Sequence, residues 1–340
     1  MKVLIAGGCG FIGMNLSIYL KEKNIKVVSI DNLYRNGSKL NEQKLSKLKI
    51  KNYRIDIKNL NKQKIGKFDF IIDCCAEPSV EVSKFELDRV VNTNLIGTFN
   101  LLKKAIKDGS NFIFLSSSRV YSIKHLRSLV KNLNIKKKLN QKTEVNEKFS
   151  TISPKSLYGF TKLSSEDLIK ELSFTFNLKY IINRFGVVSG PGQMGKVDQG
   201  FLSLWVWKHI CKEKLSYIGF GGYGNQKRDV LHINDLNEII YKQLKKIKST
   251  YNVSFNIGGG KKNLISLNEL TTLCQKISGN KIAINSIRKT SVYDIPYYCS
   301  SIKKVYKYYK WKPKLSVHQI VEDVYNWQMT DFKKLRRIIK

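Results

Sequence analysis

A tyrosine and a lysine stand four residues apart in the segment Tyr158-Gly-Phe-Thr-Lys162, a spacing that puts both side chains on one face of a helix. An ammonium group beside a phenol favours the phenolate, because its charge lowers a pKa that is ordinarily about 10. A phenolate can remove the proton of an alcohol while hydride leaves the adjacent carbon. The pattern arises easily by chance in a lysine-rich chain, so its meaning depends on its surroundings.

The apolar segment FIFLSS at 112–117 ends in the first two of three consecutive serines, Ser116 to Ser118. A hydroxyl at the end of such a strand could hydrogen-bond the same substrate oxygen as Tyr158. Alternatively, the serines only satisfy backbone groups where the strand ends.

A glycine-rich turn follows the apolar run KVLIA at 2–6, with Gly7, Gly10 and Gly13 in a GxxGxxG arrangement. Glycines allow a tight turn, close approach of the backbone to a pyrophosphate, and close packing of a helix on a strand. The apolar residues of 11–20 have helical spacing. The sequence therefore predicts a strand, a turn and a helix whose N-terminus binds phosphate.

Asp31 ends the second apolar run, VVSID at 27–31, and lies 18 residues after Gly13. A carboxylate at this place accepts hydrogen bonds from the adenosine ribose and repels a 2′-phosphate, which favours NAD over NADP. The alternative is an aspartate that only begins a turn with Asn32.

Apolar strand-like runs alternate with helical stretches at 2–6, 27–31, 70–75, 112–117 and 180–185. This alternation predicts an α/β fold with a doubly wound parallel (Rossmann) sheet and a smaller C-terminal substrate-binding lobe. Residues 122–150 are polar, and we predict that they leave the sheet before the next helix. Residues 201–210 are predicted to form an apolar helix. We expect an NAD-binding domain mainly over 1–185 and a substrate lobe mainly over 186–340, with some chain crossing back.

The composition is that of a folded protein, with 340 residues of which 42% are hydrophobic. No apolar run reaches the roughly 18 residues of a membrane span, and the N-terminus runs directly into the glycine motif, so we expect a cytoplasmic protein. The six cysteines lack metal-ligand spacing, so no metal is expected. The net charge of +35 comes mostly from lysines scattered along the chain, which favours composition bias over specific nucleic-acid binding.

Taken together, these motifs resemble the extended short-chain dehydrogenase/reductases, the NAD-dependent epimerase/dehydratase family. The resemblance runs over nearly the whole chain. Besides the segments above it includes Asp56-Ile57, Asn94 to Thr98, Gly222 to Asp229 with His232 and Asp235, Phe255 to Gly259, and Trp311 to Pro313.

The resemblance assigns roles to residues. It implies that Ser117, four residues before Tyr121, is the catalytic hydroxyl, Tyr158 the acid/base and Lys162 its partner and a ribose ligand. Besides Tyr158 and Lys162, the implied cofactor contacts are Gly7, Gly10, Phe11, Ile12, Gly13, Asp31, Asn32, Asp56, Ile57, Cys75, Ala76, Glu77, Asn94 and Ser116. The implied substrate contacts are Gln193, Gln199, Gly200 and Arg228, with Arg228 pairing with a diphosphate.

The resemblance also implies a function. The segments 116–122, 153–166 and 190–200 are most similar to NAD-dependent epimerases that act at C2 of a CDP-linked sugar, and such enzymes are homodimers or higher homo-oligomers. The alternatives are a UDP-sugar 4-epimerase or another nucleotide-sugar oxidoreductase and, more remotely, a non-catalytic nucleic-acid-binding relative. Dehydratases of the family carry Asp-Glu directly after the catalytic hydroxyl, where this chain has Ser118 and Arg119.

Two positions depart from the family pattern. Val187 stands where many members have asparagine, and Ser291 where many have arginine. Arg288 is a candidate replacement for that arginine.

Overall fold

The computed structural model describes residues 1–62, 64–141, 143–197 and 199–339, and these form two compact units. The first unit consists of Met1–Val120, Ser156–Arg184 and Asn237–Phe255. The second consists of Tyr121–Lys155, Phe185–Leu236 and Asn256–Lys340. The chain therefore crosses between the units several times, and 121–155 belongs to the second unit. The division of cofactor and substrate roles between two parts of the chain remains a prediction.

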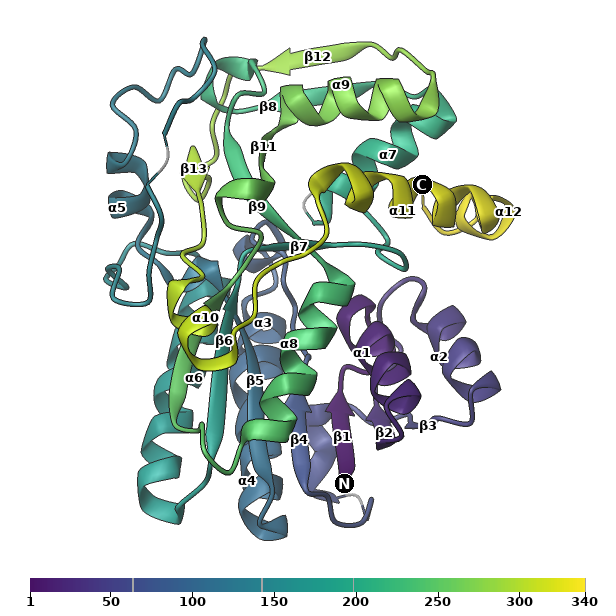
Figure 1. Ribbon diagram of the computed structural model, residues 1–340, viewed down its shortest axis with the longest axis vertical. Helices are drawn as coiled ribbons and strands as arrows, with labels where there is room; N and C mark the ends of the chain where they lie inside the picture. Colours follow the sequence, from purple (N-terminus) through teal and green to yellow (C-terminus); the bar gives the residue numbers. More distant parts are fainter. Residues whose placement is uncertain (63, 142, 198, 340) are drawn as a thin grey trace. The chain divides into compact units, whose positions relative to one another are not determined.

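A seven-stranded sheet forms the centre of the first unit, in the order β10-β6-β5-β4-β1-β2-β3 (Figure 1). The pairings of β3 with β2, β2 with β1, β1 with β4 and β4 with β5 are parallel. Its strands are β1 (Lys2–Ala6), β2 (Lys26–Ile30), β3 (Lys51–Tyr53), β4 (Phe70–Asp73), β5 (Asn111–Ser117), β6 (Tyr180–Phe185) and β10 (Val253–Ile257). The predicted fold class is confirmed, although β4 ends at Asp73, so that Cys74 and Cys75 follow the strand.

Helices cover both faces of this sheet. Because β1 leads to β2 in one direction along the sheet and β4 leads to β5 in the other, right-handed crossovers put α1 and α4 on opposite faces. The helices are α1 (Phe11–Glu22), α2 (Ser38–Lys47), α3 (Leu87–Val91), α4 (Gly97–Asp108), α6 (Leu157–Phe176) and most of α8 (Ile233–Lys246). Shorter turns are the 3₁₀ helices η1 (Ile57–Lys62), η2 (Val82–Lys84) and η4 (Ser118–Val120) and the π-helix η3 (Asn92–Ile96).

The core of the first unit explains why its strands are so apolar. Leu4 and Ala6 of β1, Ile71 of β4 and Phe112 and Phe114 of β5 are fully buried in one cluster. Strands covered on both faces need continuous apolar runs. The direction of the chain order reverses between β1 and β4, which is where ligands bind at the carboxyl ends of the strands in such sheets.

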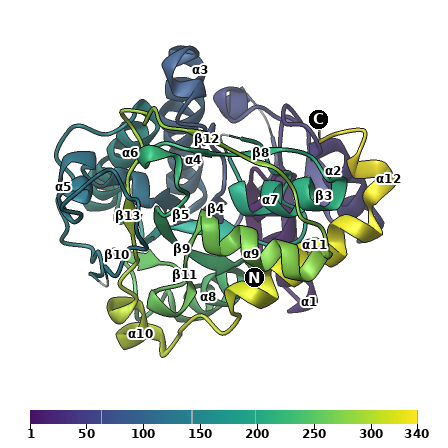
Figure 2. The same cartoon turned by 90° about the horizontal axis from the view of Figure 1, so that it is seen from above.

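The second unit has a mixed sheet and a separate helical layer. In the sheet, β9 (Lys227–His232) pairs antiparallel with β11 (Leu264–Ser266) and parallel with β7 (Val187–Ser189) and β13 (Tyr297–Tyr298). A parallel pair is formed by β8 (Leu215–Ile218) and β12 (Ile284–Ile287). Helices α7 (Phe201–Cys211), α9 (Leu267–Ser278) and α11 (Val317–Thr330) pack on one another (Figure 2). The remaining elements are α5 (Ile123–Ser128), α10 (Lys303–Tyr309), α12 (Phe332–Leu335) and the 3₁₀ helices η5 (Phe220–Gly222) and η6 (Lys261–Asn263).

Two helices of this unit begin with reciprocal caps. Ser266 and Glu269 form a capping box on α9, and Ser316 and Gln319 form one on α11. Each box satisfies N–H groups that would otherwise lack partners at the start of the helix. Among the residues described, no helix is both long and apolar enough to cross a membrane.

Candidate active site

The predicted catalytic residues meet at the start of α6 and the end of β5. The hydroxyl of Ser156 caps α6 by accepting from the N–H of Gly159, so the helix begins one residue before Tyr158. Lys162 follows one turn later, and both side chains are buried, with 8% of Tyr158 and 2% of Lys162 exposed. Ser117 at the end of β5 hydrogen-bonds the Tyr158 side chain. The structure thus brings Ser117, Tyr158 and the helix turn that carries Lys162 together.

The electrostatic environment of the phenol differs from the sequence-based expectation. Burial raises the pKa of Tyr158, while the hydrogen bond with Ser117 and the positive charges of Arg119 and Arg35 act against this rise. The cations that lower the pKa of Tyr158 most are therefore Arg119 and Arg35, whereas the sequence predicts Lys162 in this role. Glu77 is the carboxylate that raises the pKa of Tyr158 further.

Lys162 lies in an apolar setting with a buried carboxylate nearby. Its Nζ stands 4.1 Å from the centre of the Phe114 ring. Burial lowers the pKa of Lys162, and the negative charge of Asp73 opposes that effect. Asp73 itself accepts from the Thr98 hydroxyl at 2.7 Å and from the Cys75 N–H at 2.9 Å. Sequence analysis missed Asp73, yet a charged residue that ends the apolar run FIID needs partners, which is itself an indication of function.

One turn beyond Lys162 on the same helix, Glu166 forms a buried ion pair with Arg184 of β6. Glu166 accepts two hydrogen bonds from Arg184 Nε, at 3.0 and 3.1 Å, and one from Arg184 Nη2 at 2.6 Å. The hydroxyl of Ser116 donates to Glu166 Oε1 at 2.6 Å. This triad joins α6, β6 and β5, so it fixes the helix that carries Tyr158 against the strand that carries Ser117. The contact of Ser116 with the cofactor stays a prediction.

The glycine-rich turn excludes side chains at two of the positions where we predict that a pyrophosphate binds. Gly7 has φ +74°, and a Cβ at Gly13 would lie 2.2 Å from the carbonyl oxygen of Gly7. Neither position accommodates a side chain, so the backbone stays accessible to a ligand. Gly10 is the N-cap of α1 and has no side chain to occupy the first N–H groups of the helix. Phe11 and Ile12 open α1, as predicted.

Asp31 directly follows β2 and is fixed by the glycine turn. Its Oδ2 accepts from the N–H of Cys9 at 3.0 Å, and its Oδ1 accepts from the N–H of Leu33 at 2.8 Å. Burial raises the pKa of Asp31, and these two donors oppose the rise. Each oxygen keeps capacity to accept a ribose hydroxyl. Close to it in sequence, Asn32 donates to Asp56 Oδ2 at 3.0 Å, so the structure brings Asn32 and Asp56 together.

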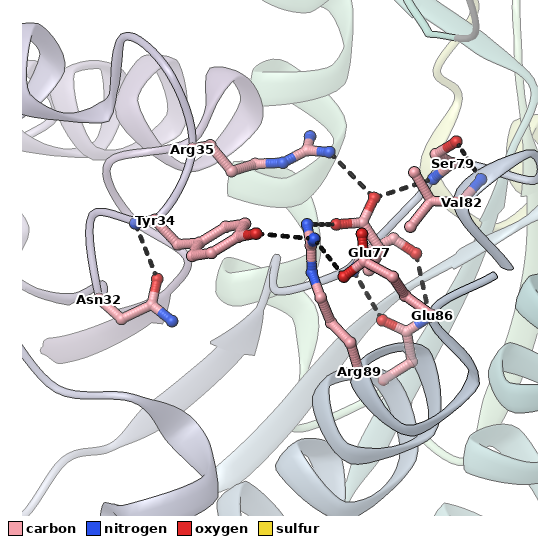
Figure 3. A network of polar contacts seen from close by, with 9 residues as sticks. Asn32, Tyr34, Arg35, Glu77, Ser79, Val82, Glu86 and Arg89 are labelled. Carbon is pink, nitrogen blue, oxygen red and sulfur yellow. Dashed lines mark hydrogen bonds and ion pairs between the residues drawn. The ribbon is translucent and has the colours of Figure 1, made fainter.

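Glu77 lies at the centre of a charged cluster that sequence analysis did not foresee (Figure 3). Its side chain is buried and forms ion pairs with Arg35, at 3.2 Å, and with Arg89. Arg89 also lies over the Tyr34 ring, 4.2 Å from its centre, and donates to Glu86 at 2.8 Å. The cluster joins the segment after β2, the segment after β4 and α3.

Asn94 connects this cluster to α6. Its Oδ1 accepts from the Glu77 N–H at 2.8 Å, and its Nδ2 donates to the Glu77 carbonyl at 3.1 Å and to Thr161 Oγ1 at 3.2 Å. Thr161 in turn donates to the Tyr158 carbonyl at 2.9 Å. Of the other predicted cofactor contacts, Cys75 and Ala76 lie in the half-buried segment after β4, and Ile57 is buried in η1.

Three of the predicted substrate residues lie together at the start of α7 in the second unit. Gln193 donates to the Val188 carbonyl at 3.0 Å and accepts from the Ser189 hydroxyl at 2.8 Å. Gly200, the N-cap of α7, has φ +75°, and a Cβ there would lie 3.2 Å from Gln193 Cδ. Gln199 pairs through its backbone with Lys196. Asp198, in the same segment, lies outside the described residues.

Arg228 lies on β9 and already has an acidic partner. Its Nη2 donates to Asp294 Oδ1 at 3.1 Å and to the Ile295 carbonyl. Arg127, which sequence analysis missed, approaches the same segment from α5, donating to the carbonyls of Asp294 at 3.0 Å and Ser291 at 2.9 Å. An arginine therefore reaches position 291 from elsewhere in the chain, whereas Arg288 is exposed.

Comparison with known proteins agrees with this geometry. The sequence profile of the NAD dependent epimerase/dehydratase family matches residues 3–258. The chain is 27% identical to CDP-paratose 2-epimerase from Salmonella typhi over 341 aligned residues, covering 96% of this chain and 99% of that protein. It is 26% identical to UDP-glucuronate 4-epimerase from Thermodesulfobacterium geofontis, with 98% of each chain covered.

A solved structure is similar over the same length. It is a variant of UDP-glucuronic acid 4-epimerase from Bacillus cereus in complex with UDP-4-deoxy-4-fluoro-glucuronic acid and NAD, with a TM-score of 0.81 and 26% identity, covering 97% of this chain and 99% of that one. This chain belongs to the NAD dependent epimerase/dehydratase family. It is an NAD-dependent enzyme of the nucleotide-sugar epimerase group, as predicted.

Proposed function

We propose that this enzyme inverts C2 of a CDP-linked 3,6-dideoxyhexose and so interconverts CDP-paratose and CDP-tyvelose. The observation that carries the chemistry is the buried phenol of Tyr158, which hydrogen-bonds Ser117 and lies one helix turn before Lys162. The substrate is supported by similarity to the Salmonella typhi enzyme along the whole chain.

The residues divide the reaction between them. Tyr158, as the phenolate, accepts the proton of the C2 hydroxyl while the C2 hydrogen leaves as hydride, which produces a 2-keto sugar. Ser117 donates to the resulting carbonyl oxygen. Bound NAD supplies the hydride acceptor and later the hydride donor, so the cofactor is regenerated in every cycle. The 2-keto sugar then turns so that its opposite face receives the returning hydride. Tyr158 returns the proton to the C2 oxygen, and the configuration at C2 is inverted.

Several residues would hold the cofactor during this cycle. The turn Gly7 to Gly13 would receive the pyrophosphate, Asp31 the adenosine ribose, and Lys162 the nicotinamide ribose. Arg228 would anchor the substrate diphosphate, which keeps the ketone bound while the sugar turns.

Dehydration is a poorer fit because water elimination needs a further acid and base. The residues after Ser117 are Ser118 and Arg119, neither of which is a carboxylic acid. Epimerisation at C4 of a UDP-sugar is the second candidate, favoured by the 26% identity to UDP-glucuronate 4-epimerase.

The test is incubation of the enzyme with CDP-paratose, and in parallel with UDP-glucose and UDP-glucuronate, followed by NMR of the products. We expect CDP-tyvelose without net consumption of NADH. Substrate deuterated at C2 should keep its label at C2 in ordinary water, whereas loss of label would indicate deprotonation beside a carbonyl. An inert CDP-paratose with an active UDP-sugar would move the assignment to the second candidate.

A further inference from the structure

Arg127 binds α5 to a turn that lies far from it in the sequence. Its Nη2 donates to the carbonyls of Ser291 at 2.9 Å and Val292 at 3.2 Å, and its Nε donates to the carbonyl of Asp294 at 3.0 Å. The Ser291 carbonyl also accepts from the Asp294 N–H at 3.0 Å, which closes the turn. The donors of a guanidinium have a rigid planar geometry, so one that binds three carbonyls fixes the orientation of the turn.

The end of this turn holds Arg228 on the neighbouring strand. The pairing of β13 with β9 puts Tyr298 in register with Arg228. Just before β13, Asp294 Oδ1 accepts from Arg228 Nη2 at 3.1 Å, and the carbonyl of Ile295 accepts from the same nitrogen. The Ile295 N–H donates to Asp294 Oδ1 at 2.8 Å and so fixes that carboxylate. Both acceptors of Arg228 Nη2 therefore belong to the turn that Arg127 binds or to the residue after it.

The helix that carries Arg127 is itself fixed within the second unit. The N–H of Ser122 donates to the carbonyl of Ser150 at 2.9 Å, and the N–H of Ile123 donates to the carbonyl of Pro154 at 3.0 Å. Helix α5 also packs against β13 (Figure 1). Arg127 can therefore hold the turn against a support that does not depend on the turn alone.

The direction of the Arg228 side chain depends on these acceptors. Its Nη1 donates to the carbonyl of Lys227 at 2.8 Å, and its Nη2 donates to the two acceptors beside the turn. The side chain keeps 14% of its surface exposed, where a ligand can reach it. Because a guanidinium binds phosphate oxygens best in the plane of its N–H groups, a shift of the turn would misdirect Arg228 without removing its charge.

We propose that Arg127 is a positioning residue that holds the segment 291–295 against β9 and so directs Arg228 at the diphosphate of the nucleotide sugar. Arg127 does this by joining several carbonyls of the turn, so its geometry matters more than its charge. The inference rests on the proposed role of Arg228 in binding the diphosphate.

The test is calorimetric titration of the NAD-loaded protein with CDP and with UDP, which needs no knowledge of the sugar. Arg127→Ala should weaken the binding of the better diphosphate by about threefold to tenfold. Arg127→Lys keeps the charge but presents all its donors from one nitrogen, so it should weaken binding nearly as much. Wild-type affinity in Arg127→Lys would show that a positive charge is sufficient and would overturn the inference.

A double variant separates positioning from direct binding. If Arg127 acts through Arg228, its replacement in an Arg228→Ala background should weaken binding further by no more than about twofold. Full additivity of the two losses would show that Arg127 acts independently of Arg228, and the inference would fail. If Arg127→Ala does not fold, Arg127→Lys alone and combined with Arg228→Ala carries the same test.

Lys124→Ala is the matched control, because it removes an exposed positive charge from the same helix. Its affinity for the diphosphates should equal that of the wild type, and a loss as large as that of Arg127→Ala would attribute the effect to net charge. Hydrogen exchange of the segment 291–295 should accelerate in Arg127→Ala and stay unchanged in Lys124→Ala. Faster exchange with unchanged diphosphate affinity would also contradict the inference.

Steady-state kinetics gives a further measurement once a substrate is found. Arg127→Ala should raise KM by about the factor found for the diphosphate and leave kcat nearly unchanged, whereas general loosening of the unit would lower kcat as well. If CDP-paratose is not converted, the substrate assignment fails while the titrations still test Arg127. Wild-type affinity for both diphosphates in Arg228→Ala would instead refute the role of Arg228, and the inference with it.

Discussion

The two units hold their predicted functional residues in different ways. In the first unit, the catalytic helix is held by bonds between side chains, as in the contacts of Glu166 with Arg184 and Ser116, while Asp31 bonds to backbone N–H groups. In the second unit, Gln193 and Arg228 mostly donate to backbone carbonyls close to their own strands and loops. A network of side chains permits few replacements, because each change leaves a buried partner unsatisfied.

We expect this difference to separate the enzyme's chemistry from its substrate preference. The first unit carries the residues to which the proposed function assigns the redox step. Contacts in the second unit depend on backbone atoms that any residue supplies, so their side chains can change with the substrate.

The largest effect should come from Tyr158→Phe, which removes the proton acceptor and little packing. We expect kcat to fall by about a hundredfold to ten-thousandfold while the bound NAD remains, since general acid–base catalysis contributes on that scale. Steady-state kinetics and the absorbance of the released cofactor measure both quantities. Lys162→Ala should reduce both the rate and the retained NAD, and a Tyr158→Phe enzyme with most of its kcat would refute the acid/base assignment.

The next largest effect concerns stability. Glu166→Gln leaves Arg184 buried without its counter-charge, and removing one partner of a buried pair typically costs about 3 to 5 kcal/mol in the free energy of unfolding. Asp167→Asn on the same helix breaks an exposed pair with Lys170 and should cost at most about 1 kcal/mol. Urea unfolding compares the two variants, and equal losses would contradict the importance given to the buried pair.

In the second unit, Arg228→Ala should affect binding more than chemistry. We expect KM to rise about tenfold with kcat nearly unchanged, because the diphosphate is held equally in the ground state and the transition state. Asp294→Asn is a useful companion, because it frees Arg228 from its carboxylate and should not raise KM in the same way. A loss confined to kcat would indicate that Arg228 acts in the chemical step, which would contradict the proposed contrast between the units.

The smallest effect should be on cofactor preference. Asp31→Ala removes the carboxylate that would face a 2′-phosphate, so the preference for NAD over NADP should weaken. Calorimetric titration with both cofactors measures the change. Tighter binding of NADP⁺ than of NAD⁺ to the wild type would show that Asp31 does not select the cofactor.

Sequence analysis predicted the sheet and its sequence motifs well because they depend on local patterns. Short contiguous segments of the sequence define the glycine turn, the strands β1, β5 and β6, and the helix that carries Tyr158 and Lys162. Even there the spacing overstated the effect of Lys162 on the pKa of Tyr158. The sequence of one helix does not show which cations other segments place near the phenol.

The contacts that were missed join residues that lie far apart in the chain. Arg35 and Glu77 are separated by 42 residues, and Arg127 and Asp294 by 167. Only the charges within apolar runs, Asp73 and Arg184, gave a local indication, since such residues require buried partners. The other contacts could not be predicted until the fold showed which distant segments lie side by side.

The π-helix at Asn92–Ile96 has a consequence for how this enzyme tolerates changes in chain length. A π turn holds one more residue than an α turn, so it behaves as a one-residue insertion between α3 and α4. Deleting a residue there would make the helix regular and rotate everything on one side of it by about 100°. Asn94 would turn away from Glu77 and Thr161, and both would lose a buried partner at once. We therefore expect a single-residue deletion in this turn to disturb the active site more than a substitution at an exposed position of the same helix.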